Sequence, residues 1–185
     1  MITVLETGVL NSVQDAGRFG YRHLGVSTSG VMDPLAFRCG NVLLGNAPYA
    51  ACLEVQTFPF SIRFDKAVSF TITGGEGVLT LNAKKLLSWC VYTAQSGDIL
   101  TLDRPSVGAR LYVCVSGGFE VPLVLNSRST QLRGGFGGYE GRPLQQGDHL
   151  AGPGGCVPDG FGAIPPNAAL PIAGVVEKEK TVTLR

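Results

Sequence analysis

The sequence predicts a mainly β fold, a closed or nearly closed barrel with one short covering helix. Short segments in which apolar and polar residues alternate recur along the chain, as in strands with one buried face. Glycine is abundant, at 26 of 185 residues, and turn-forming residues separate most of these segments. Many short strands at this spacing favour a barrel over a helical or doubly wound fold.

Six segments carry the strand pattern most clearly: residues 60–64, 68–73, 78–81, 89–93, 99–102 and 110–115. In addition, residues 95–100 and 145–150 share the pattern Gln-x-Gly-Asp-x-Leu. Glycine supplies a positive φ and aspartate can bond its own backbone, so we expect two tight turns that each launch a strand. His149 lies in the second of these segments, and we interpret it as structural.

One segment breaks the strand pattern and predicts a helix. Asp33 is an N-cap residue and Pro34 suits the first helical position, while Gly45 marks the end. The expected apolar stripe consists of Leu35, Ala36, Cys39, Val42 and Leu43. We expect this helix to cover one side of the barrel, with Asp33 serving as its cap.

The composition limits the classes of protein to which this chain can belong. A length of 185 residues with 44% hydrophobic content supports one domain with a substantial core. The net charge of +1 lacks the basic excess that nucleic acid or an anionic membrane calls for, and no apolar run has the length of a membrane span, so we expect a cytoplasmic protein. The five cysteines form no C-x-x-C pair, and no histidine has metal-ligand spacing, so we expect no metal site and no disulfide framework.

The composition changes near residue 152. Residues 1–152 form the expected barrel lobe, whereas residues 153–185 begin with proline and glycine and end with a strand-like segment at 180–185. We interpret residues 153–185 as a linker and the first strand of a truncated second lobe.

A glycine-rich loop at 126–142 is the first candidate site. It carries Arg128, Arg133 and Arg142, while Ser127, Ser129 and Thr130 add neutral donors. Arginine forks match a carboxylate or phosphate, and glycines such as Gly137 and Gly138 let backbone N–H groups approach a ligand. The alternative is a surface loop whose arginines are solvated.

The second candidate site lies near the N-terminus. Amide, carboxylate, guanidinium, phenol and imidazole groups come within ten positions punctuated by glycine, at Gln14, Asp15, Arg18, Tyr21, Arg22 and His23. This density is typical of a substrate-orienting loop. The alternative is that Asp15 and Arg18 pair to fix a surface turn. No P-loop, H-E-x-x-H or G-x-S-x-G motif occurs, and no Met-Lys-Met site for biotin is present.

Five motifs in chain order resemble the biotin-dependent carboxyltransferase-like family. They are QDAGRFGY at 14–21, SGVMDPLA at 29–36, LEV at 53–55, NSRST at 126–130 and GFGGYEGRPL at 135–144. The family includes the C-type subunit of 5-oxoprolinase, the KipA proteins, allophanate hydrolase subunit 2 and the carboxyltransferase domain of urea carboxylase. The resemblance covers residues 1–152 and implies the N-terminal lobe, a cyclophilin-like β-barrel. Family members usually have about twice this length.

The resemblance implies an ATP-dependent subunit that opens the 5-oxoproline lactam to glutamate. Its partners would be a KipI-like protein, which is the B-type subunit, and a third 5-oxoprolinase subunit. ATP would be bound in the complex, with no covalently attached biotin and no activity of this subunit alone. The alternatives are a carboxyltransferase subunit of a biotin-dependent urea carboxylase, or a KipA-like regulator that binds a kinase inhibitor.

The resemblance also implies roles for the residues of the two loops. Asp15, Arg18 and Arg128 are the expected catalytic residues. The expected substrate-binding residues, for a small carboxylate or amide, are Gln14, Ser129, Thr130, Gly137 and Gly138. We therefore expect the two loops to meet on one wall of the barrel and present donors to an anionic guest.

Overall fold

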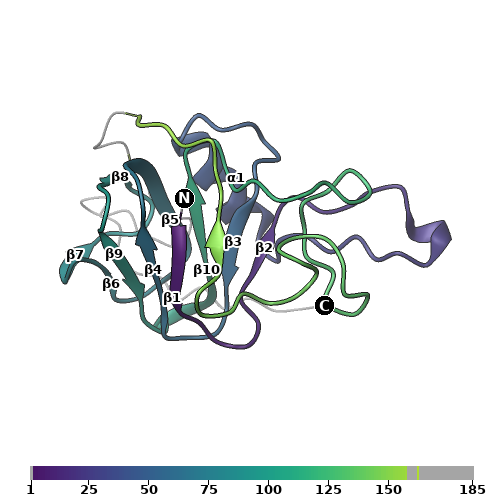
Figure 1. The fold of residues 1–185 in the computed structure, drawn as a ribbon, viewed down its shortest axis with the longest axis horizontal. Coiled ribbons are helices and arrows are strands. Elements are labelled where there is room, and N and C mark those ends of the chain that lie inside the picture. Colours follow the sequence, from purple (N-terminus) through teal and green to yellow (C-terminus); the bar gives the residue numbers. More distant parts are fainter. Residues whose placement is uncertain (1, 158–161, 163–185) are drawn as a thin grey trace, which may run out of the picture.

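The computed structural model of the protein describes residues 2–157 and 162, which form two antiparallel β-sheets (Figure 1). The six-stranded sheet contains, in spatial order, β11 (His149–Leu150), β1 (Ile2–Glu6), β4 (Phe60–Phe64), β9 (Ile99–Leu102), β6 (Leu79–Leu81) and β7 (Lys84–Leu86). The five-stranded sheet contains β2 (Ser12–Gln14), β3 (Cys52–Val55), β10 (Val107–Val115), β5 (Val68–Glu76) and β8 (Val91–Ala94). The predicted mainly β fold with one short covering helix is confirmed.

The five-stranded sheet is buried on both faces, as strand β10 illustrates. Side chains alternate across a strand, so neighbouring residues contact opposite faces. Leu111 and Val113 belong to the main apolar core, which unites residues of both sheets. Tyr112 and Cys114 belong to a second cluster, which includes Phe37 of the helix. The fold thus has two apolar layers, one on each side of this sheet.

The helix α1 (Pro34–Leu43) begins where the sequence predicts, because the Asp33 carboxylate accepts hydrogen bonds from the N–H groups of Leu35 and Ala36, each at 3.0 Å. The predicted apolar stripe is wrong in part. Leu35 and Val42 are 54% and 77% exposed, respectively. The buried face is instead formed by Ala36, Phe37, Gly40 and Asn41.

Gly40 explains why the helix buries a different face from the one that the apolar spacing predicts. A Cβ atom at Gly40 would lie 2.7 Å from Cys114 Sγ. The helix therefore approaches strand β10 most closely through a residue without a side chain, and the larger Leu35 and Val42 lie on the outside.

The two expected tight turns are also confirmed. Gln95 N–H donates to the Asp98 carboxylate at 2.7 Å, and Gln145 N–H donates to the Asp148 carboxylate at 2.8 Å. Strands β9 and β11 start directly after these turns. His149 bonds Thr3 Oγ1 through Nδ1 at 3.1 Å, which agrees with its structural interpretation.

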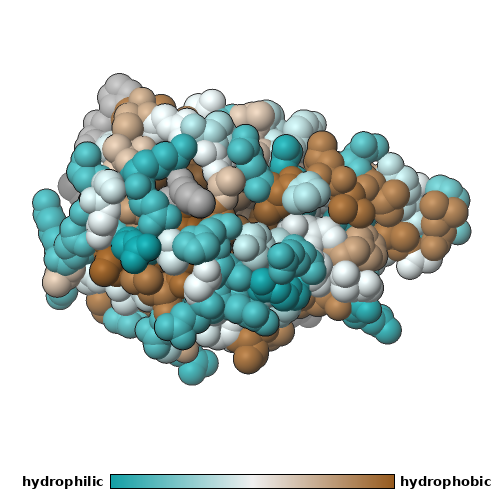
Figure 2. All heavy atoms as spheres, viewed as in Figure 1, coloured by the Kyte–Doolittle hydropathy of each residue, from teal (hydrophilic) through white to brown (hydrophobic). Residues whose placement is uncertain are grey.

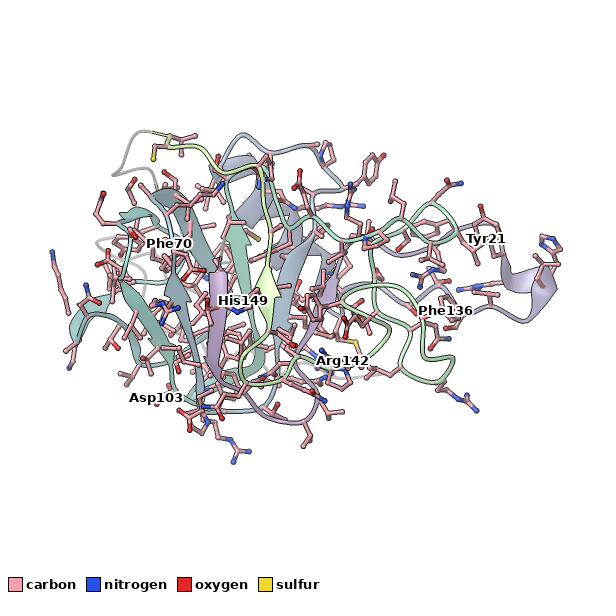
Figure 3. All side chains as sticks on the ribbon, viewed as in Figure 1. Tyr21, Phe70, Asp103, Phe136, Arg142 and His149 are labelled. Carbon is pink, nitrogen blue, oxygen red and sulfur yellow. The ribbon has the colours of Figure 1, made fainter. Side chains whose placement is uncertain are left out.

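Two loops project from one end of the sheets and lie side by side (Figure 1). The first, residues 15–32, contains the 3₁₀ helix η1 (Arg22–Leu24), and the second spans residues 121–142. Tyr21 and Phe136 mark the two loops in Figure 3, and Asn126 Nδ2 donates to Tyr21 Oη at 3.0 Å between them. The projecting end carries apolar surface (Figure 2), to which Phe19 and Leu24 contribute exposed side chains.

The chain after β11 returns to strand β5. Ser69 N–H donates to Gly155 O at 3.0 Å, and Val157 N–H donates to Ser69 Oγ at 2.9 Å. The expected strand at 180–185, with most of the predicted linker and second lobe, lies outside the described residues. Of the helices described, none combines the length and apolar character that crossing a membrane requires.

The cap of α1 gives a first prediction. Asp33→Ala should lower the free energy of unfolding by about 1 kcal/mol, because two N–H groups lose their acceptor, whereas Asp33→Asn should change it by only a few tenths of a kcal/mol. Urea unfolding of both variants measures this difference. Equal losses in the two variants would contradict the capping role.

Candidate functional site

The carboxylate of Asp15 is the centre of the contact between the two loops. Asp15 follows strand β2 directly and is 5% exposed. Its Oδ1 accepts hydrogen bonds from Gly17 N–H and Ser127 Oγ, each at 2.8 Å, and from Ser129 Oγ. Its Oδ2 accepts from the backbone N–H of Arg128 at 2.6 Å. One buried carboxylate therefore binds donors from both loops. We call the carboxylate and its donors the Asp15 cluster (Asp15, Gly17, Ser127, Arg128 and Ser129).

The next residues extend this contact along the edge of strand β2. Thr130 donates to Val13 O through its backbone N–H at 3.0 Å and through its hydroxyl at 2.8 Å. Gln14 Nε2 donates to Ser12 Oγ at 2.9 Å and to Thr130 O at 3.3 Å. The Gln14 Oε1 atom is buried without a hydrogen-bond partner among the described residues. The second loop is thus held against β2 by one backbone hydrogen bond and two hydrogen bonds between side chain and backbone.

Arg18 is almost fully buried, at 1% exposure. Its Nε donates to Val124 O at 3.1 Å, its Nη2 donates to Ser129 O, and its guanidinium lies over the Phe136 ring, 5.0 Å from the centroid. Burial lowers the pKa of Arg18, and the negative charge of Asp15 opposes that shift. Because these contacts belong to the second loop, Arg18 attaches the first loop to it.

Glycine is required at positions 137 and 138 because atoms of the same loop lie too close to leave room for a side chain. A Cβ atom at Gly137 would lie 2.3 Å from Ser129 O, and one at Gly138 would lie 1.9 Å from Thr130 Oγ1. Both residues line a cleft of about 300 Å³. The rest of its lining includes Val121, Val124, Phe136 and Tyr139, with Glu120 and Glu140 as its charged members.

The three arginines of the second loop occupy different surroundings. Arg128 is half-buried, and its Nε donates to Val121 O at 3.1 Å. Arg133 is exposed. Arg142 donates to Asp148 at 2.8 and 2.9 Å and to Glu140 at 2.9 Å. Burial raises the pKa of Asp148, but the hydrogen bonds from Arg142 and from Gln145 N–H, together with the positive charge of Arg142, lower it below its usual value, so this carboxyl remains ionised.

The structure therefore brings together the eight residues that the sequence analysis expected to be catalytic or substrate-binding. Asp15, Arg18, Arg128, Gln14, Ser129, Thr130, Gly137 and Gly138 lie in one region. Their polar groups largely bind one another, and the arginines do not line the cleft. The sequence did not indicate that Phe136 would cover Arg18 or that Val121 and Val124 would supply carbonyl acceptors, because backbone acceptors leave no signal in residue type.

The described residues contain no group of three or more His, Cys, Asp or Glu side chains that could hold a metal ion. The site is thus defined by a buried acid and a buried arginine that join two glycine-rich loops on a two-sheet β fold.

The chain belongs to the carboxyltransferase domain family, subdomain A and B, whose model matches residues 24–156. It is 42% identical over 150 residues to the C-type subunit of 5-oxoprolinase from Haemophilus influenzae, a match that covers 81% of this chain and 48% of that protein. It is 37% identical to the Escherichia coli protein of the same name, with the same coverage. The chain thus spans about half the length of the curated relatives it matches.

A solved structure supports the same assignment. The crystal structure of the K. lactis urea amidolyase superposes with a TM-score of 0.80 at 35% identity, over 91% of this chain and 10% of that one. The fold and the sequence therefore agree on the family. The relatives differ in the activity that their names give, since some are 5-oxoprolinase subunits and one is a urea amidolyase.

The Asp15 cluster gives a second prediction. Asp15→Ala should lower the free energy of unfolding by about 3 kcal/mol or more, because it leaves several buried donors without an acceptor. Asp103→Ala is the matched control, since Asp103 is exposed, and should change it by less than about 0.5 kcal/mol. Chemical denaturation measures both, and similar losses would show that the cluster does not stabilise the fold.

The glycines give a third prediction. Gly137 and Gly135 both have positive φ, at 71° and 64°, so alanine strains the backbone at either position. A Cβ at Gly135 has no neighbour within 4 Å, whereas one at Gly137 meets Ser129 O and Arg18. Gly137→Ala should therefore cost about 1–3 kcal/mol more than Gly135→Ala. Thermal unfolding measures the pair, and equal midpoints would contradict the packing.

Proposed function

We propose that this protein acts as the C-type subunit of an ATP-dependent 5-oxoprolinase that opens the 5-oxoproline lactam to glutamate. The observation that carries the proposal is the 42% identity to the C-type subunit of a 5-oxoprolinase over 150 residues. That stretch covers four fifths of the chain. The reaction is a hydrolysis of an amide bond, with ATP and water as co-reactants.

The geometry supports a division of roles among the candidate residues. Asp15 and Arg18 are buried and bound to the second loop, so we assign them the positioning of that loop. Arg128 is only half-buried, and Nε is the guanidinium nitrogen that bonds Val121 O. Its other nitrogens can donate to a carboxylate or to a developing oxyanion. Arg128 is therefore the proposed catalytic residue of this chain.

The remaining residues are proposed to shape the substrate's surroundings. Ser129 and Thr130 bind Asp15 and Val13, which fixes the backbone beside Arg128. Gly137 and Gly138 line the neighbouring cleft, where the absence of side chains lets a ligand approach the backbone. Gln14 retains a buried Oε1 acceptor beside Thr130. These groups suit a small amide or carboxylate.

The proposal includes partner proteins. A KipI-like protein, as the B-type subunit, and a third subunit would complete the site and supply the ATP site, so the chain alone would be inactive. The second candidate is a role in urea carboxylation, favoured by the structural match to a urea amidolyase. A KipA-like regulator would bind the KipI-like partner without turnover.

The test is to mix the protein with the KipI-like and third subunits and to follow ATP-dependent loss of 5-oxoproline. We expect turnover only in the complete mixture. Urea-dependent ATP cleavage without loss of 5-oxoproline would favour the second candidate. Binding of the KipI-like protein with neither reaction would favour the regulator.

A pair of arginine variants tests the role of Arg128, which is our fourth prediction. Arg128→Ala should reduce turnover at least about 100-fold, because an oriented donor to the developing charge is lost. The thermal midpoint should remain nearly unchanged. Arg133→Ala is the matched control, since Arg133 is an exposed arginine of the same loop, and should keep full turnover. A large fall in the midpoint of Arg128→Ala would assign Arg128 to the fold instead.

A further inference from the structure

A second cleft, of about 410 Å³, lies between the start of helix α1 and strands β5 and β10. Its rim carries three exposed apolar side chains, Met32, Leu35 and Val107, which are 65%, 54% and 48% exposed. The lining also includes the aromatic residues Trp89 and Tyr112 and the charged residues Asp33 and Arg110, beside Gly74, Gly75 and Gly108. No residue of this lining belongs to the Asp15 cluster.

A bulge in strand β10 opens this cleft. Val107 pairs with Glu76 and Leu111 pairs with Gly74, so residues 108–110 lie opposite Gly75 alone. A Cβ atom at Gly75 would lie 2.6 Å from Val107 O, which explains the glycine at that position. Bulges redirect side chains, and here the bulge presents Arg110 to the cleft.

Hydrogen bonds and one ion pair hold Arg110 and the backbone of Asp33 in place. Arg110 Nε lies 3.5 Å from the buried Glu54 carboxylate, and Tyr112 Oη donates to the same carboxylate at 2.9 Å. Asp33 N–H donates to Tyr112 Oη at 2.8 Å. Arg110 Nη2 also donates to Gln56 Oε1 at 3.0 Å. The charge of Arg110 is thus held in place by Glu54 and Gln56, while Nη1 is not used in these contacts.

Trp89 adds two unusual features to the lining. It has a positive φ of 64°, which is strained for a bulky residue, and its side chain is 2% exposed. Its indole Nε1 has no hydrogen-bond partner among the described residues. A buried indole N–H normally has an acceptor, so the lining contains one donor whose hydrogen bond the described residues do not satisfy.

We infer that this cleft binds a small acid that carries a carboxylate and an N–H group on one carbon atom, either an α-amino acid or a cyclic amide acid. Arg110, with the indole N–H of Trp89, would receive the carboxylate or carbonyl oxygens. The Asp33 carboxylate, which faces the N–H groups of α1 through Oδ1, would accept the ligand's N–H through Oδ2. The apolar rim would cover the carbon skeleton.

The choice of probes rests on the proposed function, because its substrate is a cyclic amide acid and its product is an α-amino acid. The binding measurement itself does not depend on that function. Trp89 is the one tryptophan of the chain and lines this cleft, so its fluorescence is a probe of the cleft. The isolated protein is titrated with 5-oxoproline, L-glutamate and glutarate, without ATP or partner subunits. Turnover can therefore fail while binding is observed, and binding can fail while turnover is observed.

We expect a saturable change in fluorescence with 5-oxoproline, with L-glutamate or with both, with a half-saturation of roughly 1 μM to 1 mM. Glutarate lacks the amino group and should bind at least about tenfold more weakly than L-glutamate wherever the latter binds. The absence of a saturable change with both nitrogen-containing ligands would overturn the inference. Equal binding of glutarate and L-glutamate would also overturn it.

Variants locate the binding. Arg110→Gln should weaken every observed binding at least about tenfold, whereas Arg104→Gln, an exposed arginine outside this lining, should leave it unchanged. Asp33→Asn is a second variant for the case in which Arg110→Gln does not fold. Asparagine still caps α1, so this variant should keep the fold. It should weaken L-glutamate about tenfold and 5-oxoproline less than about threefold, because only the amino acid carries a positive charge. Unchanged binding in folded Arg110→Gln, or in Asp33→Asn for L-glutamate, would overturn the inference.

Discussion

The buried carboxylate of Asp15 is the interaction on which the projecting part of the molecule depends. Residues 16–32 and 121–139 contain arginines but no acidic residue, so Asp15 supplies the negative charge where these two segments meet. Burying such a charge is costly unless donors surround it, and here two hydroxyl groups and two backbone N–H groups do so. The contact between the loops therefore has a polar centre, while Val121 and Tyr139 of the second loop and Ala16 and Val31 of the first pack against the two apolar clusters.

This constraint explains how glycine-rich loops can form a defined surface. Arg18 reaches from the first loop to the carbonyl groups of the second, and Phe136 covers its guanidinium. Gly137 and Gly138 then pack against Ser129 and Thr130, because no side chain would fit there. The cleft beside them is a consequence of this packing. A second polar network, around Glu54, organises the other cleft by the same means.

The sequence predicted the features that depend on local order. The strands and both Gln-x-Gly-Asp turns follow from residues close in the chain, and so does the cap at Asp33. The apolar face of α1 was predicted wrongly, because the spacing of apolar residues does not show that Gly40 must lie against Cys114. The family resemblance implied that the two loops would meet. It did not predict that Arg18 would be buried or that backbone carbonyls would bind it, since these partners lie more than 100 residues apart.

Hydrogen exchange of individual backbone amides measures whether Asp15 holds the two loops as part of the folded core. If it does, the amides of Gly17 and Arg128 should open with a free energy within about 1 kcal/mol of that of Val113 in strand β10. Exchange as fast as that of Gly20, in the exposed part of the first loop, would contradict this role of Asp15. It would show that the loops separate while the sheets stay folded.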